Sequence, residues 1–316
     1  MLKKITNILI IGYSQTGQLQ LILDSIERPL KNQQTIKITR KFIEPKQEYS
    51  FPWPFFDFLD VFPECVHLDA PKNKKLNLTD SYDLVILGYQ PWFLSPSLPT
   101  TAFLKSKEAK EALKGVPIIT VIGCRNMWVQ SQLKVIQMLG DIGAKLIDNI
   151  VLTDSASSLA TFITTPRWLL TGKKDSFLRL PKPGILDKDI KSSERFGRAI
   201  LKTITRGGNC NNGPMLTGLK AAKVNVALLK SEIIGSRSFF IWGKLLRFIA
   251  PRGSWKRKPV LLIYIIFLIT MIITVVPINL FIRSITNLFF KNKIKEMERQ
   301  FELPSGSEDS RMQEFL

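Results

Sequence analysis

The chain has 316 residues and a hydrophobic content of 45%, enough to build one large domain or two small ones, which excludes a disordered protein. Its 45 Lys and Arg against 26 Asp and Glu give a formal net charge of +19. An anionic partner, either nucleic acid or a membrane surface, is therefore expected. Three cysteines without paired spacing and a single histidine argue against a disulfide framework and a metal site.

The first predicted unit is a strand, a short polar loop and a helix. An apolar run at 8–11 enters the loop at 12–17, and apolar residues then recur at helical spacing over 19–30. Backbone N–H groups at a helix N-terminus suit a phosphate group, and the hydroxyls of Ser14 and Thr16 would add to them.

The spacing of Gly12 and Gly17 matches the nucleotide P-loop pattern G-x-x-x-x-G-K-[ST], but the two residues that carry its chemistry are missing. Gln18 stands in the position of the lysine, and Leu19 in that of the magnesium-binding hydroxyl. The dinucleotide pattern G-x-G-x-x-G is also absent. The remaining interpretations are a loop for a single phosphate and an ordinary turn between a strand and a helix.

Four further strands are predicted along the first half of the chain, at 35–42, 83–88, 116–123 and 144–152. The short β–α units that they form favour a doubly wound parallel sheet of five strands in the order 2-1-3-4-5. In such a sheet the loops that follow neighbouring strands share one crevice. The loops after Gly88 and Gly123 are therefore expected to meet the first loop.

An aromatic and proline-rich segment at 49–64 follows the second strand, and its prolines prevent it from forming a regular central strand. It is expected to form a cap over a ligand pocket, built from Trp53, Phe55, Phe56, Phe58 and Phe62. The alternatives are an insertion that packs on the core and one that rests on a membrane.

The run from Val260 to Ile282 contains no charged residue. As a helix it would extend roughly 34 Å, longer than the roughly 30 Å hydrocarbon core of a bilayer. The charged residues between 237 and 258 are all basic, which favours a single-pass helix in the cytoplasmic (inner) membrane with the N-terminal domain in the cytoplasm. The tail after the helix would cross the membrane or return on the same side as a hairpin.

Lipid then accounts for the positive charge better than nucleic acid, for which no sequence signature is present. The expected organisation is a domain at 1–155, a basic helical extension at 156–259, the membrane helix at 260–282 and a polar tail at 283–316.

Three loops resemble those of flavodoxins, which bind FMN. Ser-x-Thr-Gly at 14–17 is similar to their phosphate loop, Gly-x-x-x-Trp at 88–92 is similar to a flavin-ring loop, and a third flavin-contacting loop falls at 123–126. The resemblance implies a flavodoxin-like fold with FMN as cofactor. Matching the loops residue by residue gives the expected cofactor-binding set: Ser14, Gln15, Thr16, Gly17, Gln18, Leu19, Gln90, Pro91, Trp92, Phe93, Gly123, Cys124, Arg125 and Asn126.

Within this set, the matched loops imply distinct roles. Trp92 or Phe93 would stack on the isoalloxazine ring, and backbone groups near Gln90 would reach its edge. Arg125 would stabilise negative charge at flavin N1/O2, and Asn126 would offer amide hydrogen bonds to the ring edge.

A wider set of motifs resembles the bacterial dialkylresorcinol-condensing family, whose members act as the aromatase of dialkylresorcinol and flexirubin-type lipid biosynthesis. The motifs are Tyr13-Ser-Gln-Thr-Gly-Gln-Leu19, Phe51-Pro-Trp-Pro54, Trp92-Phe-Leu-Ser-Pro-Ser-Leu-Pro99, Gly123-Cys-Arg-Asn-Met-Trp128 and Arg237-Ser-Phe-Phe-Ile-Trp242. The resemblance implies work beside a ketosynthase, on an apolar cyclohexanedione with two alkyl arms that becomes an alkylresorcinol-type product.

The motifs define no catalytic base, and Tyr89, His67 and Glu64 are the candidates. Two other functions remain open from the sequence. One is an NAD(P)H-dependent flavin quinone reductase, and the other is a membrane-anchored electron carrier or scaffold.

Overall fold

The computed structural model describes residues 5–208, 210–289 and 291–315, and within them the side chains of all but 159, 212 and 275–294. Five strands form one parallel sheet in the order β2-β1-β3-β6-β7, so the predicted flavodoxin-like order 2-1-3-4-5 is confirmed. They are β1 (Thr6–Gly12), β2 (Ile36–Phe42), β3 (Leu84–Tyr89), β6 (Pro117–Cys124) and β7 (Lys145–Thr153). A separate two-stranded hairpin pairs β4 (Pro91–Trp92) with β5 (Ser95–Pro96).

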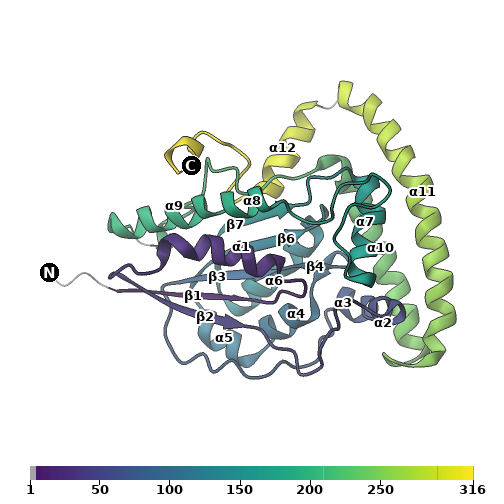
Figure 1. Cartoon of the computed structure of the whole chain (residues 1–316), viewed down its shortest axis with the longest axis horizontal. Coiled ribbons are helices and arrows are strands. Elements are labelled where there is room, and N and C mark those ends of the chain that lie inside the picture. Colours follow the sequence, from purple (N-terminus) through teal and green to yellow (C-terminus); the bar gives the residue numbers. More distant parts are fainter. Residues whose placement is uncertain (1–4, 209, 290, 316) are drawn as a thin grey trace.

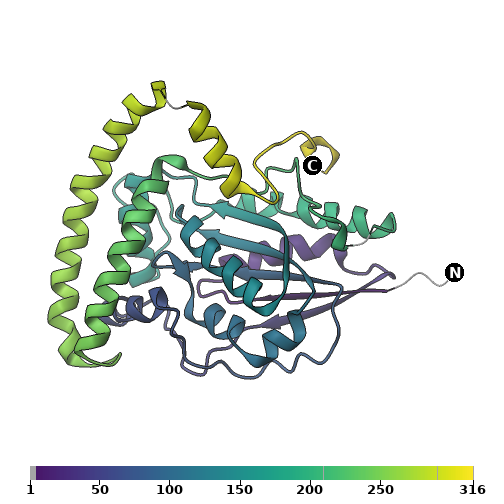
Figure 2. The same cartoon turned by 180° about the vertical axis from the view of Figure 1, so that it is seen from behind.

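Helices cover both faces of the sheet, which is why the central strands are apolar on both sides (Figures 1 and 2). In β1, Ile8 and Ile10 join one core cluster while Leu9 and Ile11 join the other. The first cluster packs under α1 (Gln18–Glu27), α8 (Asp187–Ser192) and α9 (Glu194–Thr205). The second packs under α4 (Leu98–Leu104), α5 (Lys107–Leu113) and α6 (Val129–Ile142).

Two segments each form a pair of short helices. The stretch at 98–113 forms α4 and α5 in place of one helix, because the Ser106 hydroxyl accepts a 3.0 Å hydrogen bond from Ala109 N and starts a new helix there. The aromatic segment forms two short helices, α2 (Phe55–Asp60) and α3 (Phe62–Val66). Short 3₁₀ turns occur at η1 (Arg28–Leu30), η2 (Cys210–Asn212), η3 (Trp255–Arg257) and η4 (Met312–Glu314).

The core continues past residue 155, where the sequence placed a boundary. In α9, Phe196, Ala199 and Ile200 are at most 1% exposed and lie in the same cluster as the β1 residues. The contact is close because Gly197 faces α1, and a Cβ added there would lie 2.0 Å from the carbonyl oxygen of Ile26. The extension is thus a structural layer of the sheet domain.

We expect Gly197→Ala to lower the free energy of unfolding by about 2 kcal/mol or more, because the added methyl group overlaps rigid backbone. Gly140→Ala in α6 is the matched control, since a Cβ there meets nothing within 4 Å. Alanine should raise stability at that helical site by about 0.5–1 kcal/mol. Urea unfolding of both variants tests this, and equal effects would contradict the close α1–α9 packing.

The C-terminal half adds three long helices at the end of the sheet: α7 (Ser158–Thr171), α10 (Val226–Ile249) and α11 (Lys258–Phe289). Figures 1 and 2 show α10 and α11 side by side, at the end of the molecule opposite the N-terminus. Within the described chain, one helix is long and apolar enough to cross a membrane, with its apolar window at Trp255–Thr274. The side chains of the expected span beyond residue 274 lie outside the described set.

The segment expected to be a polar tail beyond the membrane helix docks on the sheet domain. It begins with α12 (Lys291–Glu302), whose Met297 and Phe301 pack against the second core cluster. Ser305 then covers the edge of β7, donating to Asp148 Oδ1 at 2.7 Å and accepting from Asn149 N at 2.8 Å. In this structure the tail packs on the sheet domain, which is the arrangement expected if the chain returns on the same side as a hairpin.

Candidate functional site

The three loops predicted to converge do so, around one cavity of about 190 Å³ at the carboxyl end of the sheet. The loops after β1, β3 and β6 contribute Gln15, Thr16, Gln18, Leu19, Gln90, Pro91, Trp92, Phe93, Gly123, Cys124 and Arg125 to its lining. Of the expected set, Ser14 and Gly17 lie in the first loop outside this lining, and Asn126 lines a neighbouring cavity.

The first loop has the geometry of an anion site. Gly17, with a φ of 78°, sits at the start of α1, whose first N–H groups have no partner within the helix. The Ser14 hydroxyl is buried, and it has no hydrogen-bond partner among the residues that the structure describes. A buried hydroxyl without a partner beside a helix N-terminus fits an oxygen-rich ligand such as a phosphate.

The side chains of Gln15 and Gln18, which were expected to contact the cofactor, form hydrogen bonds to distant segments of the chain. The Gln18 amide exchanges two hydrogen bonds with Ile185, donating to its carbonyl at 3.0 Å and accepting from its N–H at 3.1 Å. Gln15 donates to the Ser50 carbonyl at 3.1 Å. These amides fasten the segments around 50 and 185 to the first loop, so the cavity has walls that come from distant parts of the chain.

Arg125 supplies the positive charge of the cavity. Its guanidinium stacks on Phe162 at 4.1 Å from the ring centre, and Nε donates to Asn126 Oδ1 at 3.4 Å. Burial lowers the pKa of Arg125 to about 10, which still leaves it charged at neutral pH. No carboxylate lies within ion-pair distance of it among the described side chains. The neighbouring Cys124 thiol has a pKa raised by burial and stays neutral.

The β4–β5 hairpin presents aromatic side chains to the cavity on a strained turn. Phe93 and Leu94, between the two strands, have φ angles of 49° and 58°, a conformation that normally favours glycine or asparagine. The ring of Phe93 is held 5.0 Å from Phe58 and 5.6 Å from Phe239. Non-glycine residues in this region cluster at functional sites, where packing maintains the strain.

The ring of Trp92 is already engaged with other aromatic side chains. It packs edge-on against Tyr49 at 5.1 Å and against Trp53 at 5.5 Å. Stacking of Trp92 or Phe93 on a flavin remains a prediction. The expected aromatic cap is real only in part, because Trp53 and Phe58 line the cavity whereas Phe62 turns into a separate cluster and Phe55 is exposed.

None of the three candidate bases lines the cavity. Tyr89 is fully buried on the far side of β3, where its hydroxyl donates to Gln132 Oε1 and burial raises its pKa. His67 has a pKa lowered by burial, and its Nε2 lies 3.2 Å from the Phe240 carbonyl. Glu64 forms an ion pair with Arg257 at 2.9 Å. All three have structural partners.

Sequence reasoning missed Asp154, the carboxylate that does line the cavity. Its Oδ1 accepts from Ala156 N and its Oδ2 from Gly184 N, both at 2.8 Å, so the group is held in one orientation. Asp154 directly follows β7, and the rule that pointed to the loops after β1, β3 and β6 would have pointed here too. Thr165, Trp168 and Leu169 of α7 complete this wall.

A second cavity of about 330 Å³ adjoins the first and is mostly apolar. The two share lining residues, including Phe58, Phe93 and Arg125. The far wall of the second cavity belongs to α10 and α11, through Phe239, Leu268 and Ile272. The first cavity, which contains the cation Arg125, therefore adjoins a more apolar cavity that lies along the long apolar helix.

Comparison with known proteins gives structural matches only. No protein-family model and no curated protein matches the chain. A flavoprotein in complex with FMN from Lactobacillus acidophilus is 14% identical, with 46% of this chain and 93% of that chain covered and a TM-score of 0.37. A flavodoxin from the domain Archaea is 9% identical (63% and 99% covered, TM-score 0.36), and oxidised flavodoxin 1 from Bacillus cereus is 16% identical (62% and 98%, 0.34). These TM-scores are too low to support an argument. The flavodoxin-like fold of the sheet domain is established by its strand order.

Proposed function

We propose that this chain is a membrane-associated, FMN-dependent oxidoreductase that acts on an apolar ring substrate. The observation that carries the proposal is the convergence of three loops on one cavity that holds a cation and several polar groups, beside a second and more apolar cavity. A ligand with both a phosphate and a flat apolar ring suits the first cavity, and an alkyl group suits the second.

The residues of the first cavity fit a flavin mononucleotide. The unpartnered Ser14 hydroxyl, Thr16 and the first N–H groups of α1 would hold its phosphate. Gln90, Phe93 and Arg125 would hold the ring portion. The L. acidophilus flavoprotein was crystallised with FMN, and the loops quoted above resemble those of flavodoxins.

We propose further that the reaction is the oxidation of a cyclohexanedione with two alkyl arms to a resorcinol. This change removes two hydrogens, one as a hydride and one as a proton, so it requires an acceptor for each. Bound FMN supplies the hydride acceptor. Asp154 is the carboxylate positioned to take the proton, and Arg125 favours negative charge that develops nearby. Trp53 and Phe58 form part of the cavity wall and would shield the ring from water on that side.

The apolar substrate explains the second cavity and the exposed apolar helix together. One alkyl arm would occupy the chamber lined by Phe239, Leu268 and Ile272. A membrane-soluble substrate also fits association with the cytoplasmic membrane and with a ketosynthase that would form the ring. Aromatic walls around the cavity favour catalysis over a simple electron carrier, whose flavin edge would be exposed.

The visible absorbance of the purified full-length protein is the first test. We expect flavin bands and release of FMN on denaturation, followed by conversion of a dialkylcyclohexanedione into a resorcinol under oxygen. Turnover of simple quinones with NAD(P)H instead would identify a quinone reductase. A colourless protein that FMN cannot reconstitute would refute the flavin site and leave a scaffold as the function.

A further inference from the structure

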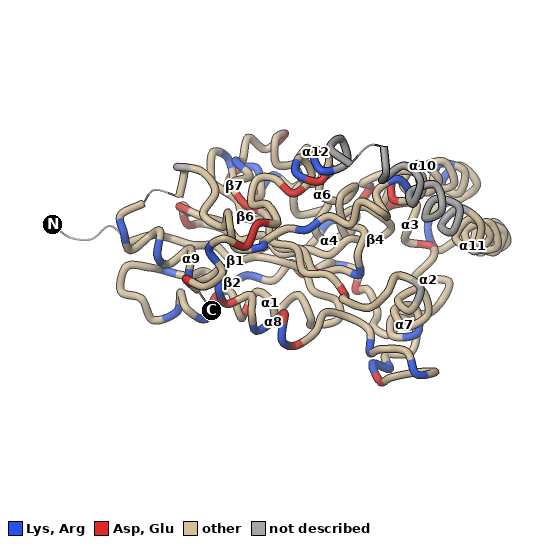
Figure 3. The backbone as a smooth tube through the Cα atoms, turned by 90° about the horizontal axis from the view of Figure 1, so that it is seen from above, with Lys and Arg blue, Asp and Glu red and all other residues tan. Residues whose placement is uncertain are grey.

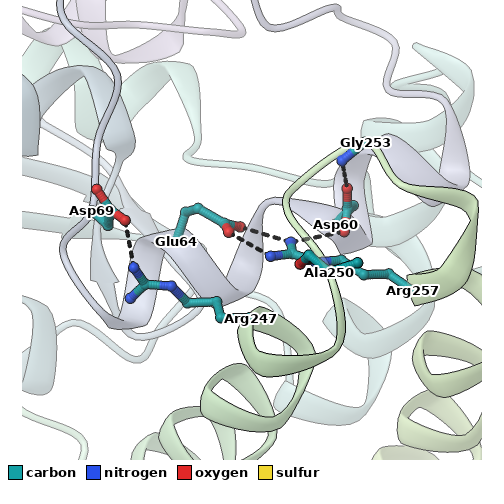
Figure 4. Close-up of polar contacts among 7 residues, drawn as sticks. All are labelled: Asp60, Glu64, Asp69, Arg247, Ala250, Gly253 and Arg257. Atoms are coloured by element: carbon teal, nitrogen blue, oxygen red, sulfur yellow. Dashed lines mark hydrogen bonds and ion pairs between the residues drawn. The ribbon is translucent and has the colours of Figure 1, made fainter.

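The turn that leads into α11 is anchored to the sheet domain by a buried arginine. The Arg257 side chain is 1% exposed and donates to Asp60 Oδ1 at 3.1 Å, to Glu64 Oε1 at 2.9 Å and to the Ala250 carbonyl at 2.7 Å (Figure 4). Asp60 also accepts from Gly253 N. Removing both carboxylates would leave the buried guanidinium charge unpaired, so the two ion pairs fix the turn to α2 and α3.

The chain beyond α11 is anchored to the same domain. Ser305 bonds to Asp148 and Asn149 of β7, and Arg311 donates to the Met215 carbonyl at 3.2 Å. Phe315 is 5% exposed and belongs to the core cluster of β1. A helix that crosses a bilayer separates its two ends by a hydrocarbon core of about 30 Å, so α11 cannot cross while both anchors hold.

Up to residue 274, where its side chains are described, α11 has one face covered by protein and the opposite face open to a solvent or lipid phase. Leu261 and Tyr264 are each 1% exposed and pack in a cluster with α2, α3 and α10. The opposite face is exposed and recurs every three or four residues: Leu262 at 46%, Ile263 at 57%, Ile266 at 67%, Ile269 at 51% and Ile273 at 66%. The sequence is apolar all round the helix, but the fold leaves a stripe exposed.

The neighbouring helix α10 exposes a stripe of mixed apolar and basic side chains. Helical spacing places Arg237, Ile241, Lys244, Leu245 and Phe248 on one face, and Phe248 is 88% exposed. The acidic residue of α10, Glu232, is buried elsewhere and accepts from Gln130 N. Exposed Trp255, Lys256 and Lys258 continue the pattern around the turn. Figure 3 shows α10 and α11 together at one end of the molecule.

We propose that these exposed residues of α10, the turn and α11, here called the hairpin surface, bind one leaflet of an anionic bilayer in plane, without crossing it. Apolar side chains would enter the boundary between headgroups and acyl chains, about 5–10 Å deep, and the basic side chains would meet lipid phosphates. The charged residues of α10 prevent the hairpin from entering the hydrocarbon core as a unit. The inference rests on the membrane association proposed above, and not on the flavin chemistry.

The first experiment asks on which side of a membrane the tail lies. Full-length Gln313→Cys and Lys110→Cys variants, in the exposed tail and in exposed α5, are labelled in inverted bacterial membrane vesicles with an impermeant maleimide. The unsubstituted chain, whose cysteines are buried or half-buried, gives the background. We expect both sites to be labelled without detergent. Protection of position 313 alone, released by detergent, would show a crossing helix and overturn the proposal.

The second experiment measures binding by flotation with vesicles of phosphatidylglycerol and phosphatidylcholine. Ile263→Glu is expected to weaken binding about tenfold or more, because a charge replaces an apolar side chain that would enter the lipid. Leu21→Glu on α1 is the matched control, since Leu21 is 55% exposed against 57% for Ile263. Lys244→Glu should weaken binding to the anionic vesicles and leave binding to pure phosphatidylcholine vesicles unchanged.

The outcomes separate the two proposals. Equal losses for Ile263→Glu and Leu21→Glu, or no flotation of the unsubstituted protein, would refute the hairpin surface. The absorbance spectrum of the same preparations reports flavin independently, so failure of the flavin proposal leaves the lipid result standing. Retained flavin with failed flotation would refute the membrane proposal alone.

Discussion

Arg125→Leu is expected to lower the turnover of the flavin-dependent reaction by about 100-fold, the effect of removing one charged group that stabilises developing negative charge. The guanidinium lines both cavities and has no carboxylate partner among the described residues, so no other side chain would replace it. FMN affinity should fall by about tenfold or more, because a charged hydrogen bond contributes about 1.5–3 kcal/mol. Steady-state kinetics and FMN titration measure the two effects.

The stability of the same variant provides the control. Arg125 is half-buried and forms no ion pair with a described side chain, although the charge of Asp154 acts on it. Replacing such a group with an apolar one of similar size is expected to cost little stability. We therefore expect the melting temperature of the flavin-free Arg125→Leu protein to change little. Arg125→Lys keeps the charge and should retain part of the activity. Full activity in Arg125→Leu would remove this residue from the site.

Asp148→Ala should have the largest effect on stability, about 4 kcal/mol. The carboxylate accepts from Met215 N at 2.7 Å, from Leu216 N at 3.3 Å and from Ser305 Oγ at 2.7 Å. Alanine leaves three buried donors without an acceptor, each costing about 1–3 kcal/mol. Urea unfolding measures the loss. Asp80→Ala is the control, since Asp80 forms an exposed ion pair with Lys37 and should cost less than about 1 kcal/mol.

The cost of Asp148→Ala should also depend on pH. Burial raises the pKa of Asp148 from its ordinary 3.8 to about 6, so the folded state holds a proton that the unfolded state releases. The carboxyl then contributes most stability below pH 4 and loses that contribution as the pH rises through 6. The loss of unfolding free energy caused by Asp148→Ala should therefore be about 1 kcal/mol larger at pH 5 than at pH 7. A cost independent of pH would show an unperturbed carboxyl.

The strands, their order and the meeting of three loops could be predicted because each depends on local pattern. Apolar runs define strands, and the order of β–α units defines which strand ends are neighbours. Gln18 was placed at the cavity correctly, yet its partner Ile185 lies 167 residues away and no local signal indicates that pair. The side-chain direction of Tyr89 depends on where β3 ends, a detail finer than sequence patterns resolve.

The path of the chain around the apolar run at 260–282 is difficult to predict for a related reason. Hydropathy records composition, and it cannot distinguish a helix surrounded by lipid from one that is covered on one face by protein. The buried face of α11 and the docked tail both depend on long-range contacts, such as the Ser305–Asp148 hydrogen bond across 157 residues. The same composition therefore suits two membrane topologies, and only the three-dimensional arrangement separates them.

The pairing of Gln18 with Ile185 has a consequence for the lifetime of a bound ligand. Gln15, Thr16, Gln18 and Leu19 line one side of the cavity, and Gly184 and Ile185 line another, so this second wall is made only after more than half of the chain has been synthesised. A fragment that stops at residue 155 would keep the sheet's strands and lose this wall. The two hydrogen bonds between Gln18 and Ile185 join the walls, so their opening would speed the release of a ligand from the intact chain.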